Sequence, residues 1–194
     1  RIAETAKGLW VVYTLISVCC VLGYEWAGMT WLDAIMHMFT TMGLGGFSSH
    51  DASFGYFNSP AIEAVAILFM LIAGCNFATH YVVLSGRSLR PYATDPEAGM
   101  FLLVTLGSVV GIAIFLDVHE VYPTFSEALR FSAFNVVSIA TTTGFANTDY
   151  ALWPFFAPLW MLFLSSFATS AGSTGGGIKM LRAIVLYTQV YREL

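Results

Sequence analysis

Two short loops of this chain share the pattern G-F-x-x-x-D: GFSSHD at residues 46–51 and GFANTD at residues 144–149. Each loop follows a segment that opens with a helix-capping box, which begins at Thr30 in the first case and at Thr124 in the second. The capping threonine precedes the glycine by 16 residues in one case and 20 in the other, a difference of about one helical turn. The same signals occur in the same order, with the G-F loops 98 residues apart, and this pattern predicts a tandem repeat.

The capped segments, residues 30–41 and 124–140, are too short to cross a membrane. Twelve residues of α-helix reach about 18 Å, whereas the hydrocarbon layer is about 30 Å thick. We therefore expect each segment to form a half-helix that enters the membrane and turns back.

Longer apolar segments flank the half-helices. Residues 9–24, 61–84 and 100–116 are each long enough, with their flanks, to span a membrane. A further stretch, residues 151–191, is interrupted, and we interpret it as one crossing broken in the middle. Four glycines at about 1 kcal/mol each stop a helix there. The interruption holds only small residues: Ala168, Thr169, Ser170, Ala171, Gly172, Ser173, Thr174, Gly175, Gly176 and Gly177.

The composition indicates a membrane protein. Of the 194 residues 57% are hydrophobic and only 10% are charged, and the mean hydropathy is +0.73. A soluble domain carries about 25% charged residues, so most of this surface must face lipid or apolar protein. A net charge of −4 argues against nucleic-acid binding, and the apolar content excludes a disordered chain.

Basic residues predict the orientation. They gather before the first span (Arg1, Lys7), in the loop between the repeats (Arg87, Arg90) and near the end of the chain (Arg182, Arg192), and we expect these places to be cytoplasmic. The acidic residues of the opposite side have two interpretations. Either they raise the local cation concentration, or they are tolerated there because acidic residues have little influence on membrane topology. These residues are Glu25, Asp33, Asp51, Asp117, Glu120, Glu127 and Asp149.

The first part of each re-entrant loop, residues 43–47 and 141–145, is uncharged, and glycine gives its backbone freedom. Irregular backbone inside a membrane is tolerated only where it is buried in protein or lines a watery cavity. Backbone carbonyls can replace the water around a dehydrated alkali cation, and the partly negative end of each half-helix points at the loop. The pattern therefore favours a cation path.

The layout resembles the repeat of the Trk/Ktr/HKT potassium transporters. The matching motifs are LGGFSSHDAS at residues 44–53 and ATTTGF at residues 140–145, and the small-residue break resembles the intramembrane loop of the third repeat in Trk-type subunits. The resemblance covers the chain from end to end and implies the second and third of four repeats, at residues 1–90 and 91–194.

The resemblance implies an all-α membrane protein with two tandem helix–pore-helix–filter-loop–helix repeats, the last helix broken by a Gly-rich intramembrane loop. It implies potassium translocation across the cell membrane, here a bacterial inner membrane, with potassium as the only bound ion. It also implies that the loop at residues 168–177 acts as a gate on the ion path. The filter residues it implies are Gly43, Leu44, Gly45, Gly46, Thr141, Thr142, Thr143 and Gly144.

Two loops cannot surround an ion, so either the other repeats lie outside this chain or two chains assemble. We favour the first, because the chain starts without Met and stops inside a helical stretch, as an internal fragment does. The implied partners are the membrane, the remaining pore repeats, a second copy in a homodimer and a cytoplasmic nucleotide-binding regulatory ring, but no nucleic acid.

The alignment of the two filter loops has an alternative. Residues 40–44 also match residues 141–145, but only the register that sets Gly46 opposite Gly144 aligns the following Phe and Asp residues as well. We therefore prefer that register, in which Gly43 stands opposite Thr141.

The sequence gives less support to other functions. The alternative to a gated, channel-like protein is a secondary transporter with a midplane substrate site at the broken helix, and a third possibility is a scaffold without transport. An enzyme is not expected: the phosphate-loop pattern is absent, no motif supports a protease built on Ser170 or Ser173 with His80, and the histidines lack metal spacing. His80 and Asn76 share a helical face. Their polar side chains either make structural hydrogen bonds within the helix bundle or line the ion path.

Overall fold

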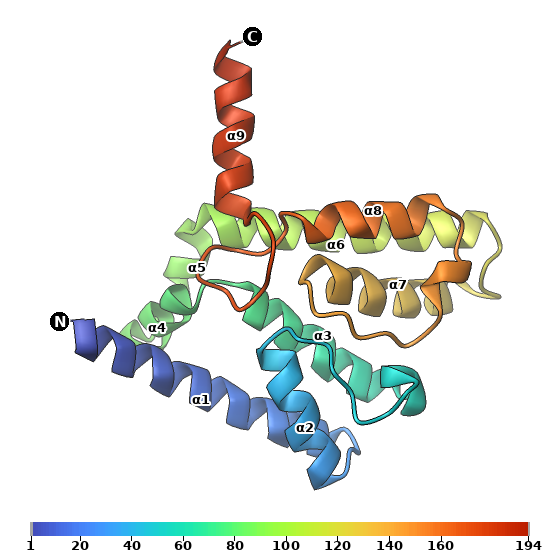
Figure 1. The fold of residues 1–194 in the computed structure, drawn as a ribbon, viewed down its shortest axis with the longest axis horizontal. Helices are drawn as coiled ribbons and strands as arrows, with labels where there is room; N and C mark the ends of the chain where they lie inside the picture. The colour runs from blue at the N-terminus through green and yellow to red at the C-terminus, as the bar shows by residue number, and fades with distance from the viewer. Residues whose placement is uncertain (1, 194) are drawn as a thin grey trace.

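The computed structural model describes residues 2–193, and within that range it consists of helices joined by loops, with no strand (Figure 1). This agrees with the predicted all-α class. The helices are α1 (Ile2–Trp26), α2 (Trp31–Met42), α3 (Pro60–Gly74), α4 (Phe77–Gly86), α5 (Arg90–Thr94), α6 (Pro96–Val118), α7 (Phe125–Ala140), α8 (Phe156–Ser165) and α9 (Met180–Glu193), with 3-10 turns η1 (Ser53–Tyr56) and η2 (Tyr150–Leu152).

The predicted unit occurs twice. Helix α1 leads to the half-helix α2, a loop and α3, and helix α6 leads to the half-helix α7, a loop and α8. In Figure 1 each loop runs back from the C-terminal end of its half-helix, which is the chain path that a re-entrant segment requires. Helix α2 has 12 residues and α7 has 16, which accounts for the one-turn difference in spacing.

The capping boxes form as the sequence predicts. The hydroxyl of Thr30 accepts the backbone N–H of Asp33, and the hydroxyl of Thr124 accepts that of Glu127. A capped N-terminus fixes where each half-helix begins, and the acidic residue in its first turn complements the helix dipole.

Within residues 2–193, two helices are long and apolar enough to cross a membrane: residues Ala6–Trp26 of α1, and α6. Their outer surfaces carry exposed apolar side chains, including Val11, Leu22 and Leu103. A surface of that kind is unfavourable in water and ordinary in lipid.

The apolar stretch of residues 61–84 is not one continuous helix, contrary to the sequence expectation. Helix α3 ends at Gly74, α4 begins at Phe77, and the two are bent by 97°. The small-residue loop (residues 168–177) compensates for the lost helical bonds: the N–H of Ser170 donates to Gly74 O at 3.0 Å, and the N–H of Phe77 donates to Gly172 O at 3.2 Å. Gly74 and the capping residue Asn76 mark the break locally, and it is further stabilised by residues about 100 positions away.

The break expected within residues 151–191 is present, because α8 ends at Ser165 and α9 begins at Met180. Helix α8 runs beside α6, whereas α9 leaves the bundle in a different direction (Figure 1). Gly177 has φ +85°, and a Cβ there would lie 2.7 Å from Ser166 O, so the chain turns sharply against the end of α8. Within the described residues of α9 only Met180 is buried.

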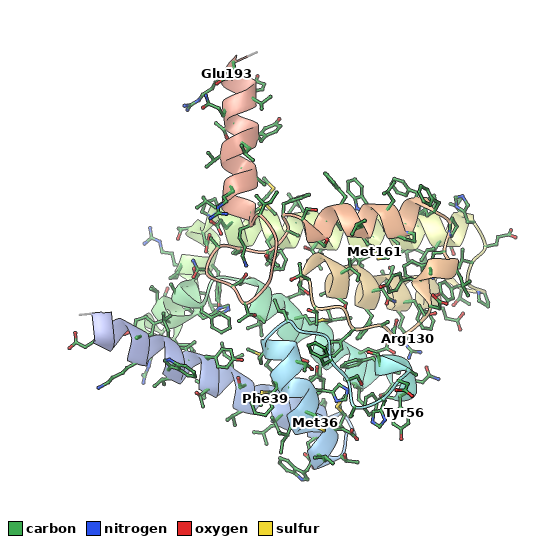
Figure 2. All side chains as sticks on the ribbon, in the orientation of Figure 1. Met36, Phe39, Tyr56, Arg130, Met161 and Glu193 are labelled. Atoms are coloured by element: carbon green, nitrogen blue, oxygen red, sulfur yellow. The ribbon has the colours of Figure 1, made fainter. Side chains whose placement is uncertain are left out.

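An ion pair joins the two repeats. Arg130 on α7 donates from Nε and from a terminal nitrogen to the Glu63 carboxylate on α3, at 2.8 and 2.7 Å, and also to Asn58 Oδ1 at 3.0 Å. Figure 2 shows Arg130 between α7 and α3. The Glu63 side chain is only 3% exposed, so this bidentate pair ties the second half-helix to the first repeat.

Candidate functional site

The two re-entrant loops have the same backbone conformation at positions 98 residues apart. Leu44 and Thr142 both have positive φ, 49° and 62°, and so do Gly46 and Gly144, at 68° and 92°. Positive φ is uncommon outside glycine, so its recurrence at one spacing means that the two loops are built alike.

Backbone hydrogen bonds follow the same spacing. The N–H of Gly45 donates to Thr40 O at 2.8 Å, and the N–H of Thr143 donates to Ser138 O at 2.8 Å. The backbones therefore match in the register that sets Gly46 opposite Gly144. All eight residues named as filter candidates directly follow the half-helices, with Gly43 and Thr141 as the C-caps.

The two loops touch each other. A Cβ placed on Gly46 would lie 2.1 Å from the carbonyl oxygen of Thr143, so only glycine permits this approach. Beyond the loops, the N–H of Gly55 donates to Ala146 O at 3.3 Å. Gly144, the counterpart of Gly46, has open space where a Cβ would lie.

The phenylalanines of the two G-F pairs differ in surroundings. Phe145 is fully buried and packs on Phe54 of the first repeat, with ring centroids 4.5 Å apart. Phe47 is 78% exposed. The second repeat thus packs its phenylalanine on the repeat before it, and the first repeat presents the same side chain outward.

The small-residue loop contacts the ends of both half-helices. The hydroxyl of Thr174 donates to Met42 O at 2.8 Å, and the N–H of Gly176 donates to the hydroxyl of Thr142 at 2.7 Å. Its first residues, Ala168, Thr169 and Ser170, are buried. The loop therefore lies next to both re-entrant loops, on the side where the half-helices end.

Two charged side chains hold the small-residue loop. Glu97 of α6 accepts the N–H of Ala171 at 2.7 Å, and Lys179 donates to the hydroxyl of Ser173 at 3.1 Å and to the carbonyl of Gly175. These bonds satisfy groups that a non-helical segment leaves free in a membrane.

A polar network surrounds the start of the first half-helix. The Asp33 carboxylate accepts hydrogen bonds from Thr30 at 2.8 Å, Ser49 at 3.0 Å and His50 at 3.0 Å, and the ring of His50 stacks on Tyr56 at 3.6 Å. Partial burial raises the pKa of Asp33, but the three hydrogen bonds outweigh it, so the pKa lies below its usual value.

The remaining candidates have structural roles in the described chain. Both ring nitrogens of His80 are engaged, with Tyr92 Oη at 2.5 Å and Ile72 O at 2.8 Å, so it has no nitrogen left to serve a serine nucleophile. Asn76 caps α4. Among residues 2–193 no group of three His, Cys, Asp or Glu side chains could hold a metal ion.

Two half-helices, two matched loops and interrupted spans beside them define a membrane transport protein of the re-entrant-loop class. A family model for TrkH, a cation transport protein, matches residues 1–194, and the chain belongs to this family. The family consists of transport proteins rather than enzymes, and the chain is a multi-pass membrane protein, as the sequence predicts.

Bacterial relatives support this assignment. The chain is 48% identical over its full length to the Trk system potassium uptake protein TrkH of Salmonella typhimurium and 37% identical to TrkG of Escherichia coli. It matches the crystal structure of the potassium transporter TrkH from Vibrio parahaemolyticus with a TM-score of 0.96 and 42% identity, over 100% of this chain and 42% of that one. The chain spans 40% of the length of both curated relatives.

Proposed function

We propose that this chain contributes two of the loops that line a potassium path through the membrane. The observation that carries the proposal is the pair of re-entrant loops with one backbone conformation that meet at Gly46 and Thr143. Each loop follows the partly negative end of a half-helix, which favours a cation. The carbonyls of residues 43–46 and 141–144 are the proposed ligands.

The relatives' names point to potassium as the transported ion. Charged side chains are absent from residues 43–46 and 141–144, so the proposed site relies on backbone oxygens, as a site for a weakly hydrated monovalent cation does. We keep residues 1–90 and 91–194 as the two repeats, with their boundary at the start of α5.

We further propose that the small-residue loop is a gate. It contacts both half-helix ends through Thr174 and Gly176, and its glycines can change conformation without a steric penalty. A static kink is the alternative, and the two differ in how flux responds to loosening the loop.

The proposed partners follow from the fact that two loops alone cannot surround an ion. A preceding pore repeat would cover the exposed Phe47, as the first repeat covers Phe145, and a following repeat would approach Gly144. A homodimer and a cytoplasmic nucleotide-binding ring beside the Arg87–Arg90 loop complete the proposal, on the strength of the family resemblance.

The test is ion flux in liposomes that contain the full-length protein. We expect Gly144→Ser to lower the ratio of potassium to sodium flux by about tenfold, because backbone strain of ~1–2 kcal/mol at a coordinating position corresponds to that factor. Gly28→Ser is the matched control, since Gly28 also has positive φ and open space but lies in the turn before α2.

Unchanged ion ratios in Gly144→Ser would contradict the proposal. Flux that stops when the sodium and proton gradients are clamped would instead favour the secondary transporter with a midplane site at the broken helix.

A further inference from the structure

Each half-helix holds the chain that follows its loop through one hydroxyl. Thr40 Oγ1 donates to Phe47 O at 2.7 Å, and Ser138 Oγ donates to Phe145 O at 2.7 Å. The backbone carbonyls of the same two residues accept the loop amides of Gly45 and Thr143. In each half-helix one residue therefore contacts the loop segment through both its side-chain hydroxyl and its backbone carbonyl, and this arrangement recurs at the 98-residue spacing.

A second tie lies one turn earlier in each half-helix, where the chemistry differs. Nδ1 of His37 lies 2.8 Å from the Asp33 carbonyl, which can only accept, so Nδ1 carries the proton and Nε2 accepts from Ser48 Oγ at 2.9 Å. This bond reaches the chain just beyond the first loop.

Asn135 makes the corresponding hydrogen bonds in the second repeat. Its Nδ2 donates to the carbonyl of Phe131, four residues earlier, at 2.8 Å and to Asn147 Oδ1 at 2.7 Å. An imidazole and an amide therefore brace corresponding segments through the same pair of contacts: one to the preceding helical turn and one to the returning chain.

We propose that Thr40 and Ser138, supported by His37 and Asn135, are positioning residues that set the ion selectivity of the two loops. This inference rests on the proposed function. The hydroxyls turn the carbonyls of Phe47 and Phe145 back onto the half-helices, which fixes the direction of the chain directly after each glycine. Carbonyl oxygens distinguish cations only while their positions are held, and a second layer of hydrogen bonds behind them can hold them.

Burial strengthens the effect of the Ser138 bond. Ser138 and Phe145 are fully buried, as are His37 and Asn135, so the Phe145 carbonyl finds no water to replace its donor once Ser138 is substituted. The bond from Thr40 to Phe47 O lies at the exposed surface of the described chain, so Thr40 acts by holding the direction of the Phe47 carbonyl. A loop with an unpaired buried carbonyl rearranges to satisfy it, because leaving it unpaired is costly.

The experiment compares Ser138→Ala with Ser132→Ala in the full-length protein. Both serines are fully buried on α7, and Ser132 also donates to backbone carbonyls, of Val109 and Leu129, but touches no loop. We expect Ser138→Ala to lower the ratio of potassium to sodium flux about fivefold, the size of one net hydrogen bond, while Ser132→Ala leaves the ratio unchanged. The melting temperature of each variant is measured alongside.

Thr40 supplies the second pair of variants and keeps the test decisive if Ser138→Ala does not fold. Thr40→Val removes the hydroxyl at constant shape, and Thr40→Ser retains it. Thr40→Val should lose selectivity, and Thr40→Ser should keep it.

Equal ratios in Thr40→Val and Thr40→Ser, or in Ser138→Ala and Ser132→Ala, would overturn the positioning role. Gly144→Ser in the same assay separates the two proposals. If it alters the ratio while the hydroxyl variants do not, only the positioning role fails; if it too has no effect, the proposed ion path fails.

Discussion

Gly46 and Gly144 occupy equivalent positions but have different neighbours. Both have positive φ, which costs an L-residue about 1–2 kcal/mol. Only Gly46 faces another loop, with the Thr143 carbonyl 2.1 Å from where its Cβ would lie. The contact between the repeats therefore depends on one of the two glycines.

We expect Gly46→Ala to destabilise the protein clearly more than Gly144→Ala. The strain of positive φ is common to both variants, whereas the backbone oxygen at Gly46 cannot move aside as a flexible side chain would. Thermal unfolding of the full-length protein in detergent measures the difference, with Gly28→Ala as the control for positive φ alone. Equal shifts in Gly46→Ala and Gly144→Ala would contradict the contact between the loops.

At the residue scale the sequence predicted the caps and the register of the loops but not the ties behind them. Thr30 and Thr124 could be identified because capping is local. Thr40 and Ser138 were missed, although a hydroxyl residue at both positions 98 residues apart was the available signal. The ion-binding role of the eight filter candidates remains a prediction.

The small-residue loop is the element whose contacts reach furthest. It bonds to the ends of α2 and α7, to the broken span between α3 and α4, and to Glu97 on α6. Its interruption of the helix could be predicted from four glycines. The break at Gly74 was missed, although Asn76 beside it is a local capping signal, and the bonds that stabilise it come from distant residues.

We expect Thr174→Val, and more strongly deletion of Gly172–Gly176, to raise potassium flux and to weaken its dependence on the regulator. Thr174→Val removes the hydroxyl that donates to Met42 O, so the loop is released from the first half-helix. Thr188→Val is the matched control, because Thr188 donates to Ile184 O on the exposed helix α9. Wild-type flux and regulation in a deletion variant that folds and inserts would reduce the loop to a static kink.

At the scale of the molecule, the two repeats pack side by side, and the free edge of the first repeat differs from the free edge of the second. The second repeat buries Phe145 against the first, and the Arg130–Glu63 pair fixes their orientation. The first repeat presents Phe47 outward, and open space adjoins Gly144. These edges suit the addition of further repeats of the same kind.

The expected orientation is tested by cysteine labelling. In a background without Cys19, Cys20 and Cys75, we expect a membrane-impermeant thiol reagent to reach Ser88→Cys only from the cytoplasmic side and Val118→Cys only from outside. The basic loop around residue 88 carries Arg87 and Arg90, and Val118 ends α6 at its opposite end. Labelling of Ser88→Cys from outside would reverse the topology and remove the proposed site of the regulatory ring.

The most direct test of the ion path is a crystal structure of the full-length protein grown in rubidium, whose anomalous scattering marks bound ions in place of potassium. We expect anomalous peaks within coordination distance of backbone carbonyls from both residues 43–46 and residues 141–144. Rubidium peaks confined to other parts of the protein, with none against either loop, would contradict the claim that these two loops line the path.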